Sequence, residues 1–591
     1  MLRKRTAKIR SIAIIAVIII IAAAIAGAIY YYRTTVPPPK PTKTFTAVMC
    51  YDFITDLDPA YSFSGEVNVM ANVYETLLVY NPEGTGVTEY GLPHSEVAPG
   101  LAVNYTVSDD GLTWIFYLRK GVKFHDGTPF NATAVKYSIE RIMELGVGAA
   151  FIWDPVEKIE IIDEYTVKFE LSYPAPLQRI VASTYGAWIY SPKTAEIENL
   201  HDWFNEGHDA GSGPYMIESL ERGVQITLKR FEDYWRGWEE HAEDRIDKVI
   251  YKIVEDPAVR VQMLETGEAQ WVEYLPTEER KRFEAMPEFQ VIRQPTYFIH
   301  YAFMNTKSPY LSDKLVRQAL AYAFPYDDWI ELGEGTYIKP PGPIPKGMWG
   351  CFEDLPQYTY NLTKAKELLA EAGYPNGGFK LKYYYISGAP TGTAGEMWKA
   401  ELEKLGIELE VVGMTWPTLW ERIKSGPEEC GYDICAFAWW PTYITPYDFL
   451  YNMFHTEEKP FWNAAFYSNP EFDNLIDTAF KLEGSDPDRA LELYREAQEI
   501  LIEDCPAVFL DQLVEVFVLP SNVKGFRTNP AYGYTTIFFW YMWIEEEGGS
   551  LTIAPGFQLT LISLIFACFG FISLPRIRHT VFNEEERVWA V

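Results

Sequence analysis

The sequence is short of the residues that build metal centres and nucleophilic active sites. Its 591 residues include only six cysteines and eight histidines. There is no Cys-x-x-Cys pair, no cysteine–histidine spacing typical of zinc, no His-Glu-x-x-His pattern and no nucleophile elbow. We therefore expect no metal, no cofactor and no catalytic residue, and we predict that the chain is not an enzyme. Its 82 acidic residues leave an extracellular glycoside hydrolase as one alternative, because that chemistry needs only two suitably placed carboxylates.

Positive charge is also scarce. Lysine and arginine number 51 against 82 acidic residues, which gives a net charge of −31. A nucleic acid would be repelled by such a surface, so no nucleic-acid partner is expected. Aromatic residues, in contrast, make up 16% of the chain, and flat rings serve either core packing or ligand stacking. Cys430 and Cys435 are close enough in sequence for a local disulfide, or both remain free buried thiols.

Charged residues are missing from a long apolar run at residues 12–32, which is long enough to span a bilayer. A basic cluster precedes this run, so the chain after it is expected outside the cell. Residues 1–33 are interpreted as a transmembrane anchor, or as a signal peptide cleaved near Ala26-Gly27-Ala28. Residues 34–44 contain four prolines and are expected to form an extended stalk.

A second apolar run is predicted to cross the membrane near the other end, at residues 557–575. Arg576 and Arg578 follow it, so the two ends agree that the intervening chain is extracellular. Pro555-Gly556-Phe557, the apolar run and the basic residues together resemble the C-terminal sorting signals of archaeal cell-surface proteins. The sequence thus predicts a head attached to the cell membrane by terminal helices, on the extracellular side.

The clearest α/β pattern lies between residues 379 and 440. Strands are expected at residues 379–386, 407–414 and 432–438, and helices at residues 393–405 and 417–425. Strands and helices that alternate at this spacing favour a parallel sheet with right-handed crossovers. Ligands gather beyond the carboxyl ends of such strands.

The residues that follow these strands form the predicted binding site. Three tryptophans and several hydroxyl groups are concentrated there. The candidate ligand-binding residues are Ser387, Trp416, Trp439, Trp440, Thr442, Tyr443 and Thr445. The alternative for each of them is core or interdomain packing.

Three local patterns elsewhere predict turns and helix starts. Ser312 is expected to cap a helix that carries Leu315, and Asp486 is expected to cap another helix. Residues 166–171 alternate polar and apolar side chains, as a half-buried strand does. His125-Asp126-Gly127 is interpreted as turn chemistry rather than as part of a catalytic site.

Several long blocks, in order, resemble family 5 of the extracytoplasmic solute-binding proteins, the dipeptide and oligopeptide class of ABC transporters. Residues 105–141 read YTVSDDGLTWIFYLRKGVKFHDGTPFNATAVKYSIER, which is similar to the family signature. Gly211-Ser212-Gly213-Pro214-Tyr215 is similar to a second motif. Further blocks lie at residues 260–268, 304–324, 361–374 and 467–500, so the resemblance covers residues 45–540.

The resemblance implies an α/β fold of the periplasmic-binding-protein type II, with two lobes, an extra small domain and a hinged ligand cleft. It implies three domains. Domain I is discontinuous and comprises residues 45–75, 211–300 and 505–545. Domain II comprises residues 76–210, and domain III comprises residues 301–504. The ligand would lie between domains I and III. The implied partners are an ABC permease and its ATPase subunits, with capture of oligopeptides or oligosaccharides as the function.

The ligand class remains open at this point. Peptide-binding members carry an acidic residue where this chain has Thr442, and a second one where it has Thr445. Threonine offers only neutral hydrogen bonds, whereas a buried ammonium group needs a charged partner. Either another acid such as Asp448 fills this role, or the ligand has no free amino terminus, as in a saccharide stacked on the tryptophans. A solute sensor without transport and a nickel- or haem-binding protein are the remaining alternatives.

Overall fold

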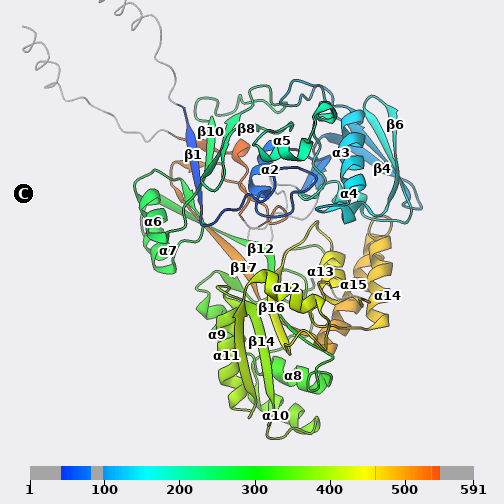
Figure 1. Cartoon of the computed structure of the whole chain (residues 1–591), viewed down its shortest axis with the longest axis vertical. Helices are drawn as coiled ribbons and strands as arrows, with labels where there is room; N and C mark the ends of the chain where they lie inside the picture. Colours follow the sequence, from blue (N-terminus) through cyan, green and yellow to red (C-terminus); the bar gives the residue numbers. More distant parts are fainter. Residues whose placement is uncertain (1–41, 81–96, 459–460, 534, 546–591) are drawn as a thin grey trace, which may run out of the picture. The chain divides into compact units, whose positions relative to one another are not determined.

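A five-stranded sheet begins the described part of the chain (Figure 1). The computed structural model describes residues 42–80, 97–458, 461–533 and 535–545. The first sheet has the order β11-β1-β10-β9-β8, and β1 pairs in parallel with both β10 and β11. Its strands are β1 (Thr44–Met49), β8 (Tyr215–Glu221), β9 (Gln225–Arg230), β10 (Lys248–Ile253) and β11 (Trp271–Val272). The helices α2 (Val67–Val73) and α6 (Pro257–Glu265) pack against β8 and β11.

A six-stranded sheet has the order β13-β17-β12-β16-β14-β15. Its strands are β12 (Phe289–Met304), β13 (Tyr337–Ile338), β14 (Lys380–Ile386), β15 (Glu408–Met414), β16 (Ile434–Trp439) and β17 (Ala507–Pro520). The helices of this region are α7 (Thr277–Glu284), α8 (Lys314–Tyr322), α9 (Tyr326–Leu332), α10 (Leu362–Glu371), α11 (Thr391–Glu403), α12 (Trp416–Lys424), α13 (Pro446–Phe454), α14 (Pro470–Leu482) and α15 (Pro487–Asp504).

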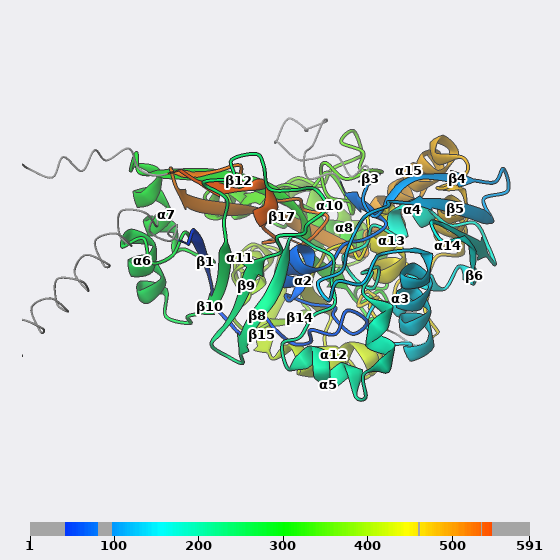
Figure 2. The ribbon, with the colours of Figure 1, turned by 90° about the horizontal axis from the view of Figure 1, so that it is seen from above.

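A four-stranded antiparallel sheet, β4-β5-β7-β6, packs against α3 at the right-hand end of the view in Figure 2. Its elements are β4 (Ala102–Val107), β5 (Thr113–Leu118), α3 (Ala132–Leu145), η1 (Ala150–Trp153), β6 (Val156–Asp163), β7 (Thr166–Leu171), α4 (Leu177–Ile180), η2 (Pro192–Glu196) and α5 (Leu200–Asn205). Short pairs are made by β2 (Leu78–Tyr80) with β3 (Val97–Pro99), and by β18 (Val523–Lys524) with β19 (Trp543–Ile544), which follows η3 (Phe539–Tyr541).

The antiparallel pair of β12 and β17 links the upper and lower halves in Figure 1. The upper ends lie near the first sheet, where β17 contacts β11. The lower end of β12 pairs with β16 inside the second sheet. The register of β12 against β17 shifts between Pro295 and Ile299, and such an irregularity bends a strand locally.

The strand and helix series predicted between residues 379 and 440 is confirmed. β14 pairs in parallel with β15 and with β16, and α11 packs on β14 and β15. Gly406 follows α11 with a φ of 75°, a conformation that glycine adopts without steric cost. The carboxyl ends of β14, β15 and β16 therefore share one edge of the sheet.

Two of the predicted local features are confirmed, and one predicted helix cap is wrong. Residues 166–171 form β7, and Asp486 caps α15 by accepting a hydrogen bond from the backbone of Arg489. The prediction for Ser312 is wrong, because the side chain of Asp313 caps α8 through the backbone N–H of Leu315 (2.8 Å). Ser312 donates instead to the carbonyl of Pro309, so the cap begins one residue later than the serine suggests.

The side chain of His125 is held by hydrogen bonds within the fold, as the turn interpretation implies. It is buried and bonded through Nδ1 to Asp209, while Nε2 lies 2.9 Å from the carbonyl oxygen of Gly213. Gly127 adopts a φ of 82°, and Asp126 accepts a hydrogen bond from the backbone of Thr128. The triplet therefore ties a turn to the neighbouring segment at residues 209–213.

The predicted membrane segments at residues 1–33 and 557–575, and most of the stalk, lie outside the described residues. Within the described ranges, no helix has both the length and the apolar character needed to cross a bilayer. Cys430 and Cys435 are free buried thiols. The described residues belong to one compact unit that ends at Glu545, and the three domain boundaries remain predictions from the resemblance.

Candidate ligand-binding site

A cavity of about 990 Å³ opens between two segments that are far apart in the sequence. One wall comes from residues 148–155 with Tyr173, and the other comes from residues 439–481. Phe63 is the lining residue from the amino-terminal segment. Half of the lining side chains are aromatic: Phe63, Phe151, Tyr173, Trp439, Tyr443, Tyr447, Tyr451, Phe461, Trp462 and Phe480. This size and composition suit a small organic solute.

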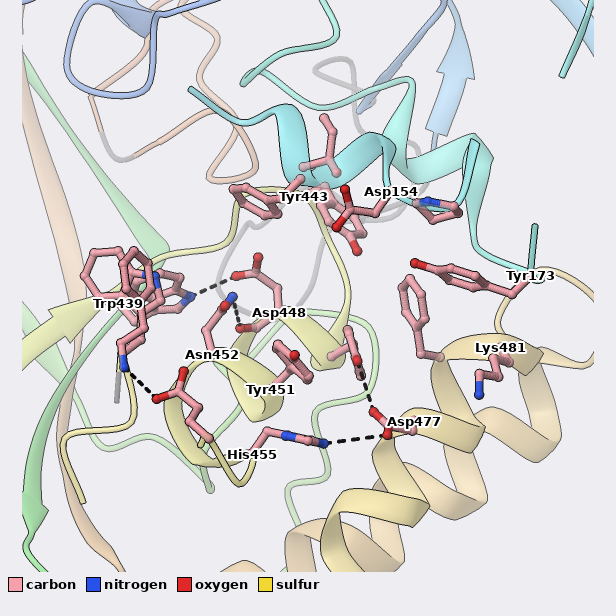
Figure 3. Close-up of a pocket in the computed structure, with 18 of the residues that line it drawn as sticks. Asp154, Tyr173, Trp439, Tyr443, Asp448, Tyr451, Asn452, His455, Asp477 and Lys481 are labelled. Atoms are coloured by element: carbon pink, nitrogen blue, oxygen red, sulfur yellow. Dashed lines mark hydrogen bonds and ion pairs between the residues drawn. The ribbon is translucent and has the colours of Figure 1, made fainter. Parts of the chain in front are cut away.

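Helix α13 supplies the polar face of one wall. It starts where the side chain of Thr445 accepts a hydrogen bond from the backbone of Tyr447 (3.0 Å), with Pro446 in the first turn. Both features favour a helix start. Because residues three and four apart share a helix face, Asp448, Tyr451 and Asn452 all reach the cavity (Figure 3).

Asp448 is the most deeply placed carboxylate of the cavity, with 3% of its surface exposed. Its Oδ2 accepts a hydrogen bond of 2.8 Å from the indole nitrogen of Trp439. Burial raises the pKa of Asp448 to about 7, and hydrogen bonds from Trp439 and Thr442 oppose that rise. The group is therefore poised to be ionised by a cation that enters the cavity, since an opposite charge favours the carboxylate.

A second polar group lies further along the same wall. The phenol of Tyr447 donates to Asp477 (3.0 Å), and Nε2 of His455 lies 3.6 Å from the other oxygen of Asp477. Burial alone would raise the pKa of Asp477, but the hydrogen bonds from His455 and Tyr447 lower it below its usual value. Asp477 is thus a carboxylate that stays ionised beside stacked tyrosine rings.

The structure brings only part of the predicted site to this cavity. Trp439 and Tyr443 line it. Thr442 is buried beside it and holds Asp448, while its own carbonyl accepts a hydrogen bond from Ser183 (2.8 Å). Thr445 is fully buried, caps α13 and donates to Glu483.

Like Thr442 and Thr445, the other three predicted residues are not among the residues that line the cavity. Trp440 is 38% exposed and stacks on Phe298 of β12, with centroids 5.5 Å apart. Trp416 stacks on Trp462, with centroids 6.2 Å apart and planes at 10°. Ser387 is exposed at the end of β14. Only the end of β16, among the three strand ends, therefore opens directly onto the cavity.

Sequence reasoning missed most of the opposite wall. Asp154, Phe151 and Tyr173 belong to segments around β6 and β7, and no local pattern joins them to residues 439–481. Tyr447 and Tyr451 had a usable signal, because Thr445-Pro446 is a helix-start pattern that places residues 447, 448 and 451 on one side of the helix.

A seam of hydrogen bonds joins α4 and Tyr80 to Ile444 and Glu483, which are not themselves lining residues of the cavity. Arg179 donates to the carbonyl of Ile444 (3.1 Å) and lies 3.4 Å from Oε2 of the buried Glu483. Tyr80 accepts a hydrogen bond from the backbone of Ile444 (2.9 Å). The resemblance places the ligand between domains I and III, whereas the walls found here come mainly from the segments assigned to domains II and III.

Known proteins are similar to this chain in sequence and in fold. Residues 96–461 match the family described as "Bacterial extracellular solute-binding proteins, family 5 Middle". The probable D,D-dipeptide-binding periplasmic protein DdpA of Escherichia coli (strain K12) is 30% identical over 484 residues, which cover 80% of this chain and 89% of that protein. The glutathione-binding protein GsiB of Escherichia coli O1:K1 / APEC is 30% identical over 443 residues, or 74% of this chain and 84% of that protein.

A solved structure agrees with these relatives. The ABC transporter-associated periplasmic binding protein DppA from Helicobacter pylori, in complex with the peptide STSA, superposes with a TM-score of 0.68 at 27% identity, covering 85% of this chain and 98% of that chain. The protein therefore has the α/β fold of periplasmic binding proteins and is a solute-binding protein rather than an enzyme. The family match, the relatives and the fold together place the chain in family 5 of the bacterial extracellular solute-binding proteins.

Proposed function

We propose that this protein captures short peptides outside the cell and delivers them to the permease of an ABC importer. The observation that carries the proposal is the buried carboxylate of Asp448 in an aromatic cavity of about 990 Å³. A peptide has an α-ammonium group that needs such a partner, and apolar side chains that fit between rings. The names of the relatives, which include dipeptide- and glutathione-binding proteins, favour the same class of solute.

The proposed mechanism is a two-state closure about the β12 and β17 pair. A peptide touches both walls of the cavity only when the walls are close, so its binding energy favours the closed form. In that form Asp448 holds the amino terminus while Trp439 and Tyr443 pack on the chain. The permease then recognises the closed form, and ATP hydrolysis takes place in other subunits.

The apolar runs near both ends would keep the head at the membrane, on the extracellular side. This part of the proposal rests on the basic residues that flank each run and on the proline-rich stretch at residues 34–44. An anchored binding protein stays near its permease, which raises its effective concentration there.

An oligosaccharide is the second candidate solute, and the aromatic wall favours it. Sugar rings stack on indole and phenol rings, and carboxylates such as Asp448 accept hydroxyl hydrogen bonds. The two solutes differ in one respect, because only a peptide presents a free ammonium group to Asp448.

Isothermal titration of the full-length protein in detergent tests the proposal. We expect mixed tetrapeptides to bind at micromolar or lower Kd, N-acetylated peptides to bind at least ten-fold more weakly, and cello-, manno- and xylo-oligosaccharides to give no heat. Binding of the oligosaccharides alone would refute peptide capture.

A matched pair of variants locates the site. Trp439→Phe keeps a ring in the wall but removes the hydrogen bond that orients the Asp448 carboxylate. The carboxylate is then less well placed for the ammonium group of the peptide, so peptide affinity should fall about ten-fold, as expected when one charge-assisted bond is weakened. Trp440→Phe changes the neighbouring tryptophan outside the lining and should leave the affinity unchanged. Equal effects of the two substitutions would place the peptide elsewhere.

A further inference from the structure

Acidic side chains predominate among the charged groups of the cavity. Asp154, Asp448, Glu457 and Asp477 line it, whereas Lys481 is the lysine among the lining residues. His455 adds a second basic group, but it already faces Asp477. The lining therefore favours a solute with more positive than negative charge, since unlike charges attract strongly in a partly desolvated cavity.

Asp154 is one of the lining acids that the peptide-capture proposal leaves without a role. It follows η1 and has no ion pair with a lysine, arginine or histidine in the described part of the chain. Burial raises its pKa, and its charge acts on the phenols of both Tyr173 and Tyr451. Tyr451 belongs to the opposite wall, so Asp154 faces across the cavity.

The close-up shows this arrangement (Figure 3). Asp154 comes from one wall, and Asp448 and Asp477 come from the other, with Tyr451 on the same helix as Asp448. A side chain that bridges the two walls would meet carboxylates from both.

Stacked aromatic rings in the same wall of the cavity can also contact a positively charged side chain. The rings of Tyr447 and Tyr451 are 4.9 Å apart at 29°, and Tyr447 is 4.3 Å from Phe480. A lysine or arginine side chain packs its methylene groups on such rings and is attracted to their faces. The carboxylate of Asp477 lies at the edge of this stack, bonded to Tyr447.

We propose that the cavity selects basic peptides, and that a lysine or arginine side chain of the peptide binds over Tyr451 between Asp154 and Asp477. This specificity rests on the proposed capture of peptides. It adds a second positive group to the solute, separate from the amino terminus held by Asp448. Because the two carboxylates come from opposite walls, the basic side chain also helps to close the cavity.

The test compares tetrapeptides that differ by one charge. A polyalanine tetrapeptide carries either lysine or norleucine at position 2, 3 or 4. Norleucine has a similar unbranched chain without the ammonium group, and every peptide keeps its free amino terminus. Isothermal titration of the full-length protein in detergent should show at least ten-fold tighter binding of the lysine peptide at one position.

Two variants assign the preference to this site. Asp154→Asn should remove most of the preference for lysine and leave the affinity for the norleucine peptide unchanged. Asp109→Asn removes another exposed carboxylate, one outside the cavity, and should keep the full preference. In the wild type, raising the NaCl concentration from 50 to 500 mM should weaken the preference, because salt screens partly exposed charges.

The outcomes separate the two proposals. If no peptide binds, peptide capture is wrong, and the basic specificity falls with it. If lysine and norleucine peptides bind equally well at all three positions, peptide capture stands and the basic specificity is overturned. A preference for lysine that survives Asp154→Asn would also contradict the assignment to this site.

Discussion

The buried carboxylate of Asp448 should lower the free energy of unfolding of the solute-free protein. Its pKa is about 7 in the folded protein because of burial, against an ordinary value of 3.8. Above pH 7 the folded state must hold a charge that is better solvated in the unfolded chain. Asp448→Asn keeps an acceptor for Trp439 without the charge, so we expect it to raise the free energy of unfolding at pH 8 by about 1–3 kcal/mol. Thermal or urea unfolding of the solute-free protein measures this gain, while peptide affinity should fall.

Asp477 provides the control for this prediction because its pKa shifts in the opposite direction. His455 and Tyr447 stabilise its charged form against the effect of burial, so Asp477→Asn should lower the stability at the same pH. A loss of stability in both variants would mean that Asp448 is held by interactions stronger than its burial cost.

At the scale of single residues, the sequence predicted two of the residues that line the candidate cavity, Trp439 and Tyr443. Trp439 and Tyr443 follow a strand with clear flanks, so their place at the sheet edge could be inferred. Trp416 and Trp440 follow equally clear strand ends, but their rings stack on Trp462 and Phe298, respectively. Which neighbour covers a ring depends on tertiary packing, and strand periodicity carries no information about it.

Among the secondary-structure elements, the short helix α4 is bonded to Ile444 and Glu483, close in sequence to residues that line the cavity. Arg179 from α4 reaches Glu483, which is fully buried and also accepts hydrogen bonds from Thr445 and Tyr494. Arg179→Met keeps a long side chain against Trp349 but leaves Glu483 without a cation. We expect the free energy of unfolding to fall by about 3 kcal/mol, the usual cost of breaking a buried ion pair.

A double-mutant cycle separates the charge from the packing. Glu483→Gln in the Arg179→Met background removes the unpaired charge and keeps an acceptor for Thr445 and Tyr494. It should therefore recover much of the lost stability, measured by urea unfolding. If the double variant is less stable than Arg179→Met, the seam depends on the packing of Arg179 rather than on its charge.

The elements themselves differ in how far the sequence revealed them. The alternation at residues 379–440 predicted β14, α11, β15, α12 and β16, because each element has its own periodicity and its own terminating residues. The seam between α4 and residues 442–445 joins segments more than 250 positions apart, for example Arg179 with Ile444. Such contacts arise only when the chain has folded, so no window of sequence contains them.

Across the whole molecule, buried acids set the pH dependence of stability. Glu515 lies buried in β17 with its pKa raised to about 8, first by burial and then by the charge of Glu273. Burial likewise raises the pKa values of Glu75, Glu273 and Glu483. The pKa of His125 is raised by Asp209 against the effect of burial. Each of these groups holds its proton more tightly in the folded protein than in the unfolded chain.

The sign of the effect follows from this common direction. Between pH 5 and 8 the folded state binds more protons than the unfolded chain does, so the free energy of unfolding falls as the pH rises. Exposed acids with lowered pKa values, such as Glu160 and Glu170, change the free energy of unfolding with pH only below their ordinary pKa of 4.5. They therefore do not oppose this trend between pH 5 and 8. We therefore expect the solute-free protein to show a Tm several degrees higher at pH 5.5 than at pH 8.

The variant Glu515→Gln tests the origin of this trend. It removes a group that titrates near pH 8 and should flatten the slope of Tm against pH, with most of its stabilising effect at pH 8 and little at pH 5.5. Scanning calorimetry of the wild type and the variant across this range makes the comparison. A Tm that rises from pH 5.5 to 8 in the wild type would show that the buried carboxylates of Glu273 and Glu515 are paired more strongly than their surroundings indicate. Only acids whose charged form is well compensated gain stability on ionisation.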